Sequence, residues 1–264
     1  MNKYQSIPLV LAIGGHDPSG GAGLQADIEA IAANGGHALT IVTALTTQNT
    51  CTIKEIYPQP PSQIEAQCRL IFEESSIAAI KIGLLGSTSI IHILANLLDE
   101  IPQIPVILDP ILTAGNDGTQ FADKSLQDAI CEYLLPRCTL VTPNSIEARI
   151  LGKHADLACC AETIITNGCA SVLITGTHET SHKVINQLYT LSGLLQEYQW
   201  PRLIDNYHGS GCTITSAIAT QIALGKSLAS AVIQAQLYTW ESLQQAFLSG
   251  HCQLTPNRFY AQRC

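Results

Sequence analysis

A glycine-rich turn runs directly into an apolar helical pattern at residues 205–225, DNYHGSGCTITSAIATQIALG. The first N–H groups of a helix have no acceptor within it, and the helix dipole favours negative charge there. We therefore predict that the N–H groups of Gly209, Ser210, Gly211 and Cys212 form an anion hole, for which phosphate is the natural guest. The same position should lower the pKa of Cys212 and make its thiolate available as a base or nucleophile. A flexible helix cap without a ligand is the alternative.

A second glycine-rich stretch, GGHDPSGGAGLQAD at residues 14–27, follows an apolar run. Its glycines allow a sharp turn and leave room for a ligand beside the backbone. Asp27 shares a helix face with Leu24 and Ile31, so its carboxylate should be buried and should need a donor, which a polar ligand would supply. The alternative is that Asp27 only complements the positive end of a helix.

Polar groups also follow other strand-like runs. Gln48, in TALTTQNT, carries an amide that could read the edge of a heteroaromatic ring, although an ordinary turn would look the same. Asp109, Asn144 and Glu147 offer hard oxygen ligands that suit Mg²⁺ shared with phosphates, although each could be a helix cap. Together with an anion hole, they favour phosphoryl transfer from a nucleotide.

Apolar runs rich in Val and Ile must position these groups. They cover residues 8–13, 39–46, 77–84, 105–112, 140–143 and 171–176, and stretches with helical spacing separate them. This alternation predicts an α/β fold with a mainly parallel, doubly wound sheet buried on both faces. Residues 183–190 and 194–200 alternate apolar with polar around LSG, which predicts a β-hairpin. No linker or repeat divides the chain, so we expect one domain over residues 1–264.

Composition narrows the class of partner. The formal net charge is −8 with 13% charged residues, which argues against nucleic acid or an anionic membrane as the main partner. None of the ten cysteines forms C-x-x-C, so we expect reduced and mostly buried thiols. The apolar run near the N-terminus is too short for a signal peptide or membrane span, which favours a cytoplasmic protein.

Two short motifs match known patterns in the wrong context. HETSH at residues 178–182 fits the zinc-protease pattern but lies between two predicted strands rather than on a helix, so we interpret it as a loop. GKS at residues 225–227 resembles the end of a phosphate-binding loop but follows a helical segment, so we interpret it as a helix end with a glycine stop.

Taken together, the segments HDPSGGAGLQAD, TALTTQNT, KIGLLGS, VILDPIL, LVTPNSIEA and HGSGCT occur in this order at family-like spacings. They resemble the hydroxymethylpyrimidine/phosphomethylpyrimidine kinase family of thiamine biosynthesis, within the ribokinase-like superfamily, nearly end to end. The resemblance implies a three-layer α/β/α sandwich with a Rossmann-like sheet. It also implies an ATP- and Mg²⁺-dependent kinase, assembled as a homodimer, that phosphorylates 4-amino-5-hydroxymethyl-2-methylpyrimidine and then its monophosphate.

The resemblance also assigns roles to residues. Cys212 would assist deprotonation of the hydroxymethyl oxygen while Gly209, Ser210 and Gly211 hold the migrating phosphoryl group. The pyrimidine site would be lined by Gly15, Ala22, Asp27, Thr46, Gln48, Leu84 and Ile111. Asn144, Thr175 and Gly176 would contact the nucleotide, and Asp109 and Glu147 would hold Mg²⁺.

One departure from the family keeps other functions open. The family usually has a lysine near the nucleotide phosphates where this chain has Thr175, and Lys153 or Lys183 would have to replace it. Pyridoxal kinase activity and a non-catalytic regulator that binds the pyrimidine phosphate are therefore alternatives. A thiol hydrolase using Cys212 with His208 is a third, although no third orienting group is evident.

Overall fold

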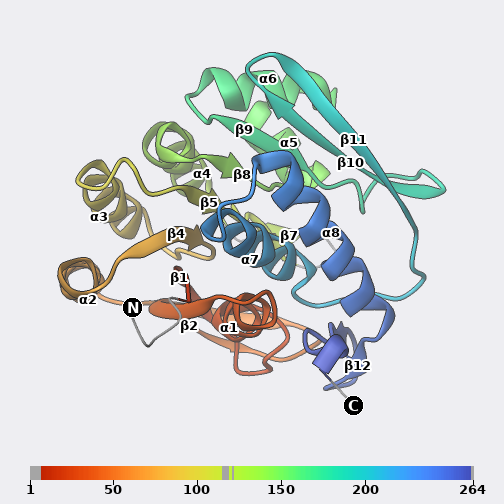
Figure 1. The fold of residues 1–264 in the computed structure, drawn as a ribbon, viewed down its shortest axis with the longest axis horizontal. Helices are drawn as coiled ribbons and strands as arrows, with labels where there is room; N and C mark the ends of the chain where they lie inside the picture. The colour runs from red at the N-terminus through yellow and green to blue at the C-terminus, as the bar shows by residue number, and fades with distance from the viewer. Residues whose placement is uncertain (1–6, 115–118, 121, 263–264) are drawn as a thin grey trace, which may run out of the picture.

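The computed structural model describes residues 7–114, 119–120 and 122–262, and a nine-stranded sheet forms its centre (Figure 1). Its strands are β1 (Leu9–His16), β2 (His37–Gln48), β3 (Ile53–Pro58), β4 (Ile77–Ile82), β5 (Val106–Leu108), β8 (Leu140–Val141), β9 (Ser171–Ile174), β10 (Lys183–Thr190) and β11 (Gly193–Pro201). They lie in the order β11-β10-β9-β8-β5-β4-β1-β2-β3. The six strands from β9 to β2 are parallel, and β3, β10 and β11 are antiparallel at the two edges.

Helices cover both faces of the sheet. One layer contains α1 (Gly23–Ala33), α7 (Ser210–Ala223) and α8 (Leu228–Gln244). The other contains α2 (Pro61–Glu74), α3 (Thr88–Asp99), α4 (Lys124–Ala129), α5 (Ser145–Gly152) and α6 (Leu157–Thr166). Shorter elements are a π-helical turn (Ile130–Leu134), 3₁₀ turns (Leu135–Arg137 and Tyr260–Gln262), and the pairs β6 (Thr113–Ala114) with β7 (Thr119–Gln120) and β12 (Phe247–Leu248) with β13 (Leu254–Thr255).

The alternation of side chains along the strands divides the core in two. In β1, Leu11 and Ile13 pack toward the α2–α6 layer, whereas Val10 and Ala12 pack toward α1, α7 and α8. All four are fully or almost fully buried. The expected three-layer α/β/α sandwich with a mainly parallel sheet is therefore confirmed.

Several sequence predictions can be compared with individual elements. The predicted hairpin is formed by β10 and β11. Gly225, the glycine predicted to stop the helix, lies just after the end of α7 and has φ +81°. Residues 178–182 of the HETSH motif form turns, not a helix. The edge strand β3 was missed because its IKEIYP sequence carries charged residues and is largely exposed, so it has no buried-strand pattern.

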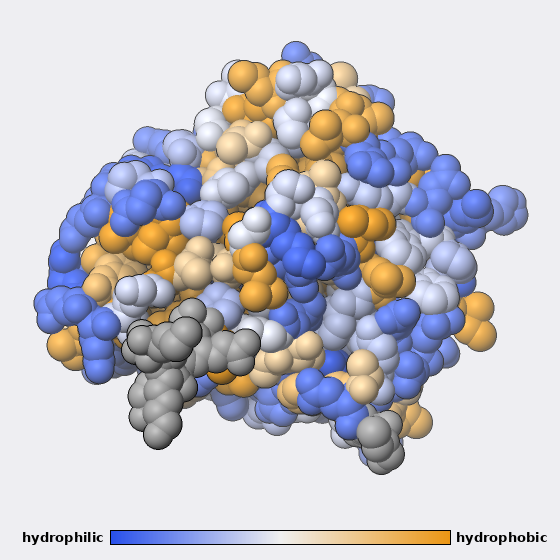
Figure 2. All heavy atoms as spheres, in the orientation of Figure 1, coloured by the Kyte–Doolittle hydropathy of each residue, from blue (hydrophilic) through white to orange (hydrophobic). Residues whose placement is uncertain are grey.

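Hydrophobic residues lie in small groups among hydrophilic ones on the face shown in Figure 2. Within the described part of the chain, none of the helices has both the length and the apolar character that a membrane span requires.

The expectation that all thiols are reduced is wrong for one pair. Cys51, in the turn between β2 and β3, forms a disulfide with Cys252, in the turn between β12 and β13. The other described cysteines, seven in number, are free. Because 201 residues separate the two partners, no spacing motif could indicate the bond. The turns also touch directly, since a Cβ on Gly250 would overlap the side chain of Thr50.

We expect reduction of this disulfide to lower the free energy of unfolding by about 2–5 kcal/mol, because the bond closes a long loop in the unfolded chain. The measurement is urea denaturation of the wild-type chain with and without a thiol reductant. The double variant Cys51→Ser, Cys252→Ser is the control and should not respond to the reductant. Equal stability of the oxidised and reduced wild-type chain would contradict the prediction.

Candidate active site

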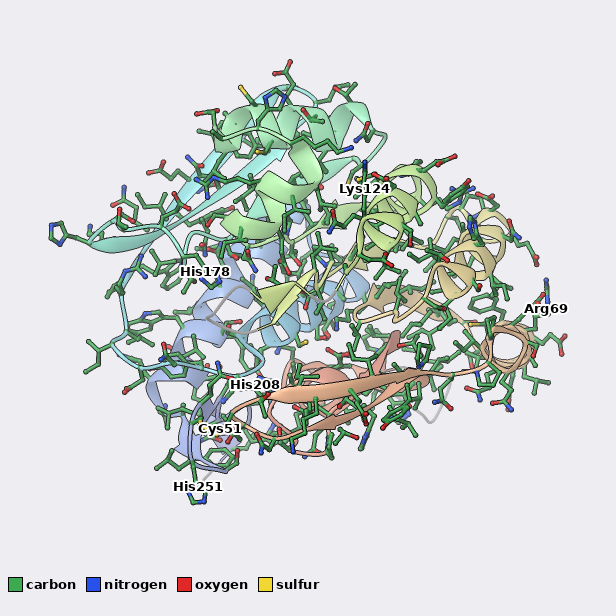
Figure 3. The ribbon with its side chains drawn as sticks, turned by 180° about the vertical axis from the view of Figure 1, so that it is seen from behind. Cys51, Arg69, Lys124, His178, His208 and His251 are labelled. Atoms are coloured by element: carbon green, nitrogen blue, oxygen red, sulfur yellow. A yellow bond between two sulfur atoms is a disulfide. The ribbon has the colours of Figure 1, made fainter. Side chains whose placement is uncertain are left out.

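A cavity of about 330 Å³ opens at the carboxyl ends of the parallel strands. Ligands of open α/β sheets bind at this edge because loops from several strands converge there. Figure 3 shows His178, His208 and Cys51 on this side of the molecule, opposite Arg69. The sequence-predicted residues that line the cavity are Gly15, Ala22, Thr46, Gln48, Leu84, Asp109, Ile111, Asn144, Glu147, Thr175, Gly209, Ser210, Gly211 and Cys212.

Asp27 is a correction to the predicted site. Its side chain is fully buried outside the cavity lining, and both of its carboxylate oxygens lie within 2.8–2.9 Å of Lys81 Nζ. The Ser216 hydroxyl also donates to Oδ1 at 2.8 Å. The donors that Asp27 needs therefore come from β4 and α7 rather than from a ligand, and Asp27 does not line the cavity.

Gly176 is also outside the cavity lining. Its N–H donates to Asn186 Oδ1 at 3.0 Å, and a Cβ at this position would overlap the carbonyl oxygen of Ile185 in β10. The glycine thus lets the chain after β9 pass close to the neighbouring strand.

The predicted anion hole lies at the start of α7. Gly209 is the N-cap and has φ +83°, and a Cβ there would overlap the carbonyl oxygen of Gly21. Only glycine satisfies both conditions without strain. The helix then begins at Ser210, so the N–H groups of its first turn are directed toward the cavity that Ser210, Gly211 and Cys212 line. This geometry suits an anionic group.

The expected lowering of the pKa of Cys212 is wrong. Burial raises the pKa of the Cys212 thiol to about 12, although Lys81 opposes the shift. The helix N-terminus does not compensate, because the side chain is only 5% exposed and water cannot solvate a thiolate. Cys212 is therefore a protonated thiol at neutral pH.

Two buried carboxyl groups face the same region. Burial raises the pKa of Asp109 to about 6, and burial together with the nearby Asp109 raises that of Glu147 to about 7. Glu147 and Asn144 also form the capping box of α5, so the helix-cap alternative is correct for both even though both line the cavity. The Glu147 carboxylate accepts the N–H groups of Leu112 and Asn144 at 2.9 and 3.0 Å.

These carboxyl groups fit the expected Mg²⁺. Among the described residues, no group of three or more His, Cys, Asp and Glu side chains is placed to hold a metal alone. Mg²⁺ is commonly bound by one or two carboxylates together with phosphate oxygens and water. Asp109 and Glu147, beside an anion hole, match that donor set. The backbone of the adjoining Ile111 has φ +36°, which is unusual for a β-branched residue and typical of functional sites.

Gln48 carries a polar atom that the protein leaves without a partner. Its Oε1 is buried and has no hydrogen-bond donor among the described residues. Gln48 lies at the end of β2 and lines the cavity together with Thr46, Ile53 and Ile56 of the β2–β3 pair. A buried unpaired acceptor is costly, so a ligand that donates a hydrogen bond at this position would be favoured.

Sequence analysis missed the pair formed by Asp17 and His208. His208 Nε2 lies 2.8 Å from Asp17 Oδ2, and the Asp17 carboxylate also accepts the N–H groups of Ser19 and Ala22 at 2.8 Å. Burial would raise the pKa of Asp17, but the hydrogen bonds from His208 and Ser19 lower it to about 2. Asp17 is therefore an orienting group for His208 that the sequence did not reveal, but among the described residues no hydrogen bond joins His208 to Cys212, as a thiol hydrolase would need.

The part of the cavity near Thr175 was also incompletely predicted. Neither Lys153 nor Lys183 lines the cavity: Lys153 lies 3.7 Å from Asp128, and Lys183 donates to Gln199. Arg202 does line it, and its guanidinium donates to backbone carbonyls of residues 177, 179 and 181. The neighbouring indole rings of Trp200 and Trp240, with centroids 6.1 Å apart, line the cavity as well.

Comparisons with known proteins agree with this arrangement. A family model described as phosphomethylpyrimidine kinase matches residues 17–257. A hydroxymethylpyrimidine/phosphomethylpyrimidine kinase of Salmonella typhimurium is 33% identical over 243 residues, which are 89% of the chain and 91% of that protein. The chain is 34% identical over 248 residues, 91% of its length, to a thiamine biosynthesis multifunctional protein of Corynebacterium glutamicum, of which it spans 32%.

A solved structure extends the similarity to the whole fold. The pyridoxal kinase of Staphylococcus aureus in complex with ADP matches with a TM-score of 0.88 and 26% identity, over 98% of the chain and 96% of that protein. A relative with this fold thus binds a nucleotide, as the anion hole and the strand-end carboxylates of the cavity indicate.

Proposed function

The chain belongs to the phosphomethylpyrimidine kinase family, and from this premise we propose that it transfers the γ-phosphoryl group of ATP to a hydroxymethylpyrimidine. The first acceptor would be the hydroxymethyl oxygen of 4-amino-5-hydroxymethyl-2-methylpyrimidine. A phosphate oxygen of the resulting monophosphate would be the second. In each step a P–O bond to the acceptor forms as the bond from the γ-phosphorus to the β-phosphate oxygen breaks, and ADP leaves.

The unpaired Oε1 of Gln48 is the observation that carries this proposal. The exocyclic amino group of the aminopyrimidine is a donor that would satisfy this oxygen, and the apolar Ile53, Ile56 and Leu84 around it suit the ring. The anion hole at Gly209 to Cys212 belongs to the same cavity. A ring held at Gln48 would therefore present its hydroxymethyl group toward bound phosphate.

Asp109 and Glu147 would hold Mg²⁺, which supplies charge neutralisation for the phosphates when it is bound. The protein itself adds the N–H groups of Ser210 and Gly211 at the start of α7. These donors are fixed before the reaction and stabilise charge on the migrating group without reorganisation. Arg202 is a further cation at the cavity, on the side where the family carries its lysine and this chain has Thr175.

Cys212 would move the proton of the hydroxymethyl group. Because its thiol is protonated, it accepts the substrate proton only as its own proton leaves, and Asp109, whose pKa it lowers, is the neighbouring acceptor. The O–H bond breaks, an S–H bond re-forms, and the earlier thiol proton passes to the Asp109 oxygen that Mg²⁺ would leave free. In a loose transition state the hydroxymethyl oxygen loses its proton late in the reaction, so Cys212 does not have to be a strong base before phosphoryl transfer begins.

Replacement of Gln48 by alanine should raise the KM for the pyrimidine by about 5–10-fold and leave kcat nearly unchanged, because one hydrogen bond of about 1 kcal/mol is lost from ground and transition state alike. Steady-state kinetics with varied pyrimidine at saturating MgATP measures both constants. Gln48→Glu is the matched control: it keeps an acceptor for the amino group and should bind the pyrimidine better than the alanine variant. An unchanged KM in Gln48→Ala would place the ring elsewhere.

Pyridoxal is a second candidate substrate, favoured by the structural match to a pyridoxal kinase. It is also a hydroxymethyl heteroaromatic, so the cavity would hold it in the same way. Competition between the two substrates for limiting MgATP gives the ratio of their kcat/KM values. A ratio in favour of pyridoxal would replace our assignment of the substrate. Tight pyrimidine binding without ADP release would instead support the regulator.

A further inference from the structure

A buried arginine near the C-terminus reaches the start of α7. The side chain of Arg258 is fully buried, and its Nε donates to the hydroxyl of Thr213 at 2.9 Å. On its other side the guanidinium donates to the carbonyl oxygen of Gly21 and pairs with Glu29 at 3.0 Å. A fully buried guanidinium is kept only where its donors are used, and here they link three segments of the chain.

Thr213 connects Arg258 to the anion hole. Its hydroxyl accepts from Arg258 Nε and donates to the carbonyl oxygen of Gly209 at 2.7 Å. The N–H of Thr213 donates to the same oxygen at 3.0 Å. Because Arg258 occupies the acceptor side of the hydroxyl, the hydroxyl proton is directed to Gly209.

The peptide between Gly209 and Ser210 is therefore held from one side. In a trans peptide the C=O and the following N–H point in opposite directions. Fixing the Gly209 carbonyl toward Thr213 directs the Ser210 N–H outward from the helix start, into the cavity. This control matters because Gly209, with φ +83°, has the conformational freedom of glycine and could otherwise rotate the peptide.

The guanidinium of Arg258 also offsets the dipole of the Gly21 carbonyl group, which lies beside the anion hole. The carbonyl oxygen of Gly21 lies against Gly209, where a Cβ would overlap it. The partial negative charge of this oxygen would disfavour an anion at the neighbouring helix start, and the hydrogen bond from Arg258 offsets that charge.

We propose that Arg258 is a positioning residue for the anion hole, acting through the Thr213 hydroxyl on the Gly209–Ser210 peptide. The inference rests on the proposed function, since it assumes that this hole holds the transferred phosphoryl group. A purely structural role for Arg258 would appear as a loss of stability alone. The Thr213 hydroxyl separates the two roles, because its removal leaves the contacts of Arg258 with Gly21 and Glu29 in place.

The test compares Thr213→Val with Thr213→Ser. The valine keeps the shape of threonine but removes the hydroxyl, and we expect kcat to fall about 10-fold or more while the KM for the pyrimidine changes less than about threefold. The serine keeps the hydroxyl and should retain kcat within about twofold. Arg258→Met should lower kcat at least as much, and the double variant Arg258→Met, Thr213→Val should lose little beyond Arg258→Met, because both act on one peptide.

Glu29→Gln is the control for stability, since it removes the ion pair of Arg258 but not its contact with Thr213. It should leave kcat unchanged. A Thr213→Val chain with the kcat of the wild type, or a loss of kcat in Glu29→Gln equal to that in Arg258→Met, would overturn the inference.

Calorimetric measurement of AMP-PCP binding in the presence of Mg²⁺ tests the role of the Thr213 hydroxyl without turnover. If the wild-type chain phosphorylates neither substrate but Thr213→Val weakens AMP-PCP binding and Thr213→Ser does not, the proposed function fails and the inference stands. If Thr213→Val matches the wild type both in AMP-PCP binding and in kcat, or matches it in AMP-PCP binding when the wild-type chain has no turnover, the inference fails.

Discussion

Cys212→Ala should lower kcat for pyrimidine phosphorylation by about 10²–10⁴-fold, the usual contribution of a positioned acid–base group, with a much smaller change in KM. The side chain lies at the start of α7, lines the cavity and adjoins Asp109, whereas Gln48 lies at the end of β2. Its loss therefore affects proton movement more than ring binding. Single-turnover measurement of ADP and product formation at saturating substrate gives the chemical step directly.

Cys212→Ser is the matched variant for this prediction. A serine hydroxyl keeps a small, buried hydrogen-bonding group beside Asp109, so it should recover part of the rate if the group exchanges one proton for another. If a pre-formed thiolate were the base, serine would be as inactive as alanine, because its hydroxyl ionises far less readily. Turnover of Cys212→Ala equal to that of the wild type would remove Cys212 from the mechanism.

The second large effect concerns stability. Lys81→Met should lower the free energy of unfolding by about 3–5 kcal/mol, because it leaves the Asp27 carboxylate buried without its counter-charge. Lys81 Nζ lies 2.8 Å from Asp27 Oδ1, and both side chains are at most 1% exposed. Burial would lower the pKa of Lys81, but the carboxylates of Asp27 and Asp109 raise it above its usual value, so the lysine is charged. Urea denaturation measures the change.

Two controls separate this effect from a general loss of packing. The double variant Lys81→Met, Asp27→Leu removes both charges and should recover most of the stability. Arg69→Met removes an exposed ion pair with Glu65 and Glu100, which should cost less than about 1 kcal/mol. A double variant as unstable as Lys81→Met alone would show that the charge pair is not the cause.

The sheet and most of the cavity lining could be predicted from the sequence because they depend on local patterns. Val- and Ile-rich runs mark strands buried on both faces, and the residues that follow them, such as Asp109 and Asn144, must meet at one edge of a parallel sheet. Gly209, the residue before α7, could be predicted equally well, because a glycine-rich turn that leads into a helix is a local feature.

The errors concern partners that lie far apart in the chain. Asp27, in α1, was assigned to a ligand because its partner, Lys81, is 54 residues away in β4. A lysine inside the apolar run at residues 77–84 was the available signal, since a buried cation needs a carboxylate. The pKa of Cys212 was misjudged because a helix position indicates the local dipole but not the burial that outweighs it. Arg258 and Cys252 come from the C-terminal segment, whose position no local pattern indicates.

The most direct test of the central claim is mass-spectrometric analysis of the products after incubation of the purified chain with MgATP and 4-amino-5-hydroxymethyl-2-methylpyrimidine, with pyridoxal in a parallel reaction. We predict that the pyrimidine monophosphate forms first and the diphosphate follows, each with release of ADP. Absence of both pyrimidine products, while ATP is bound or pyridoxal is phosphorylated, would contradict the assignment.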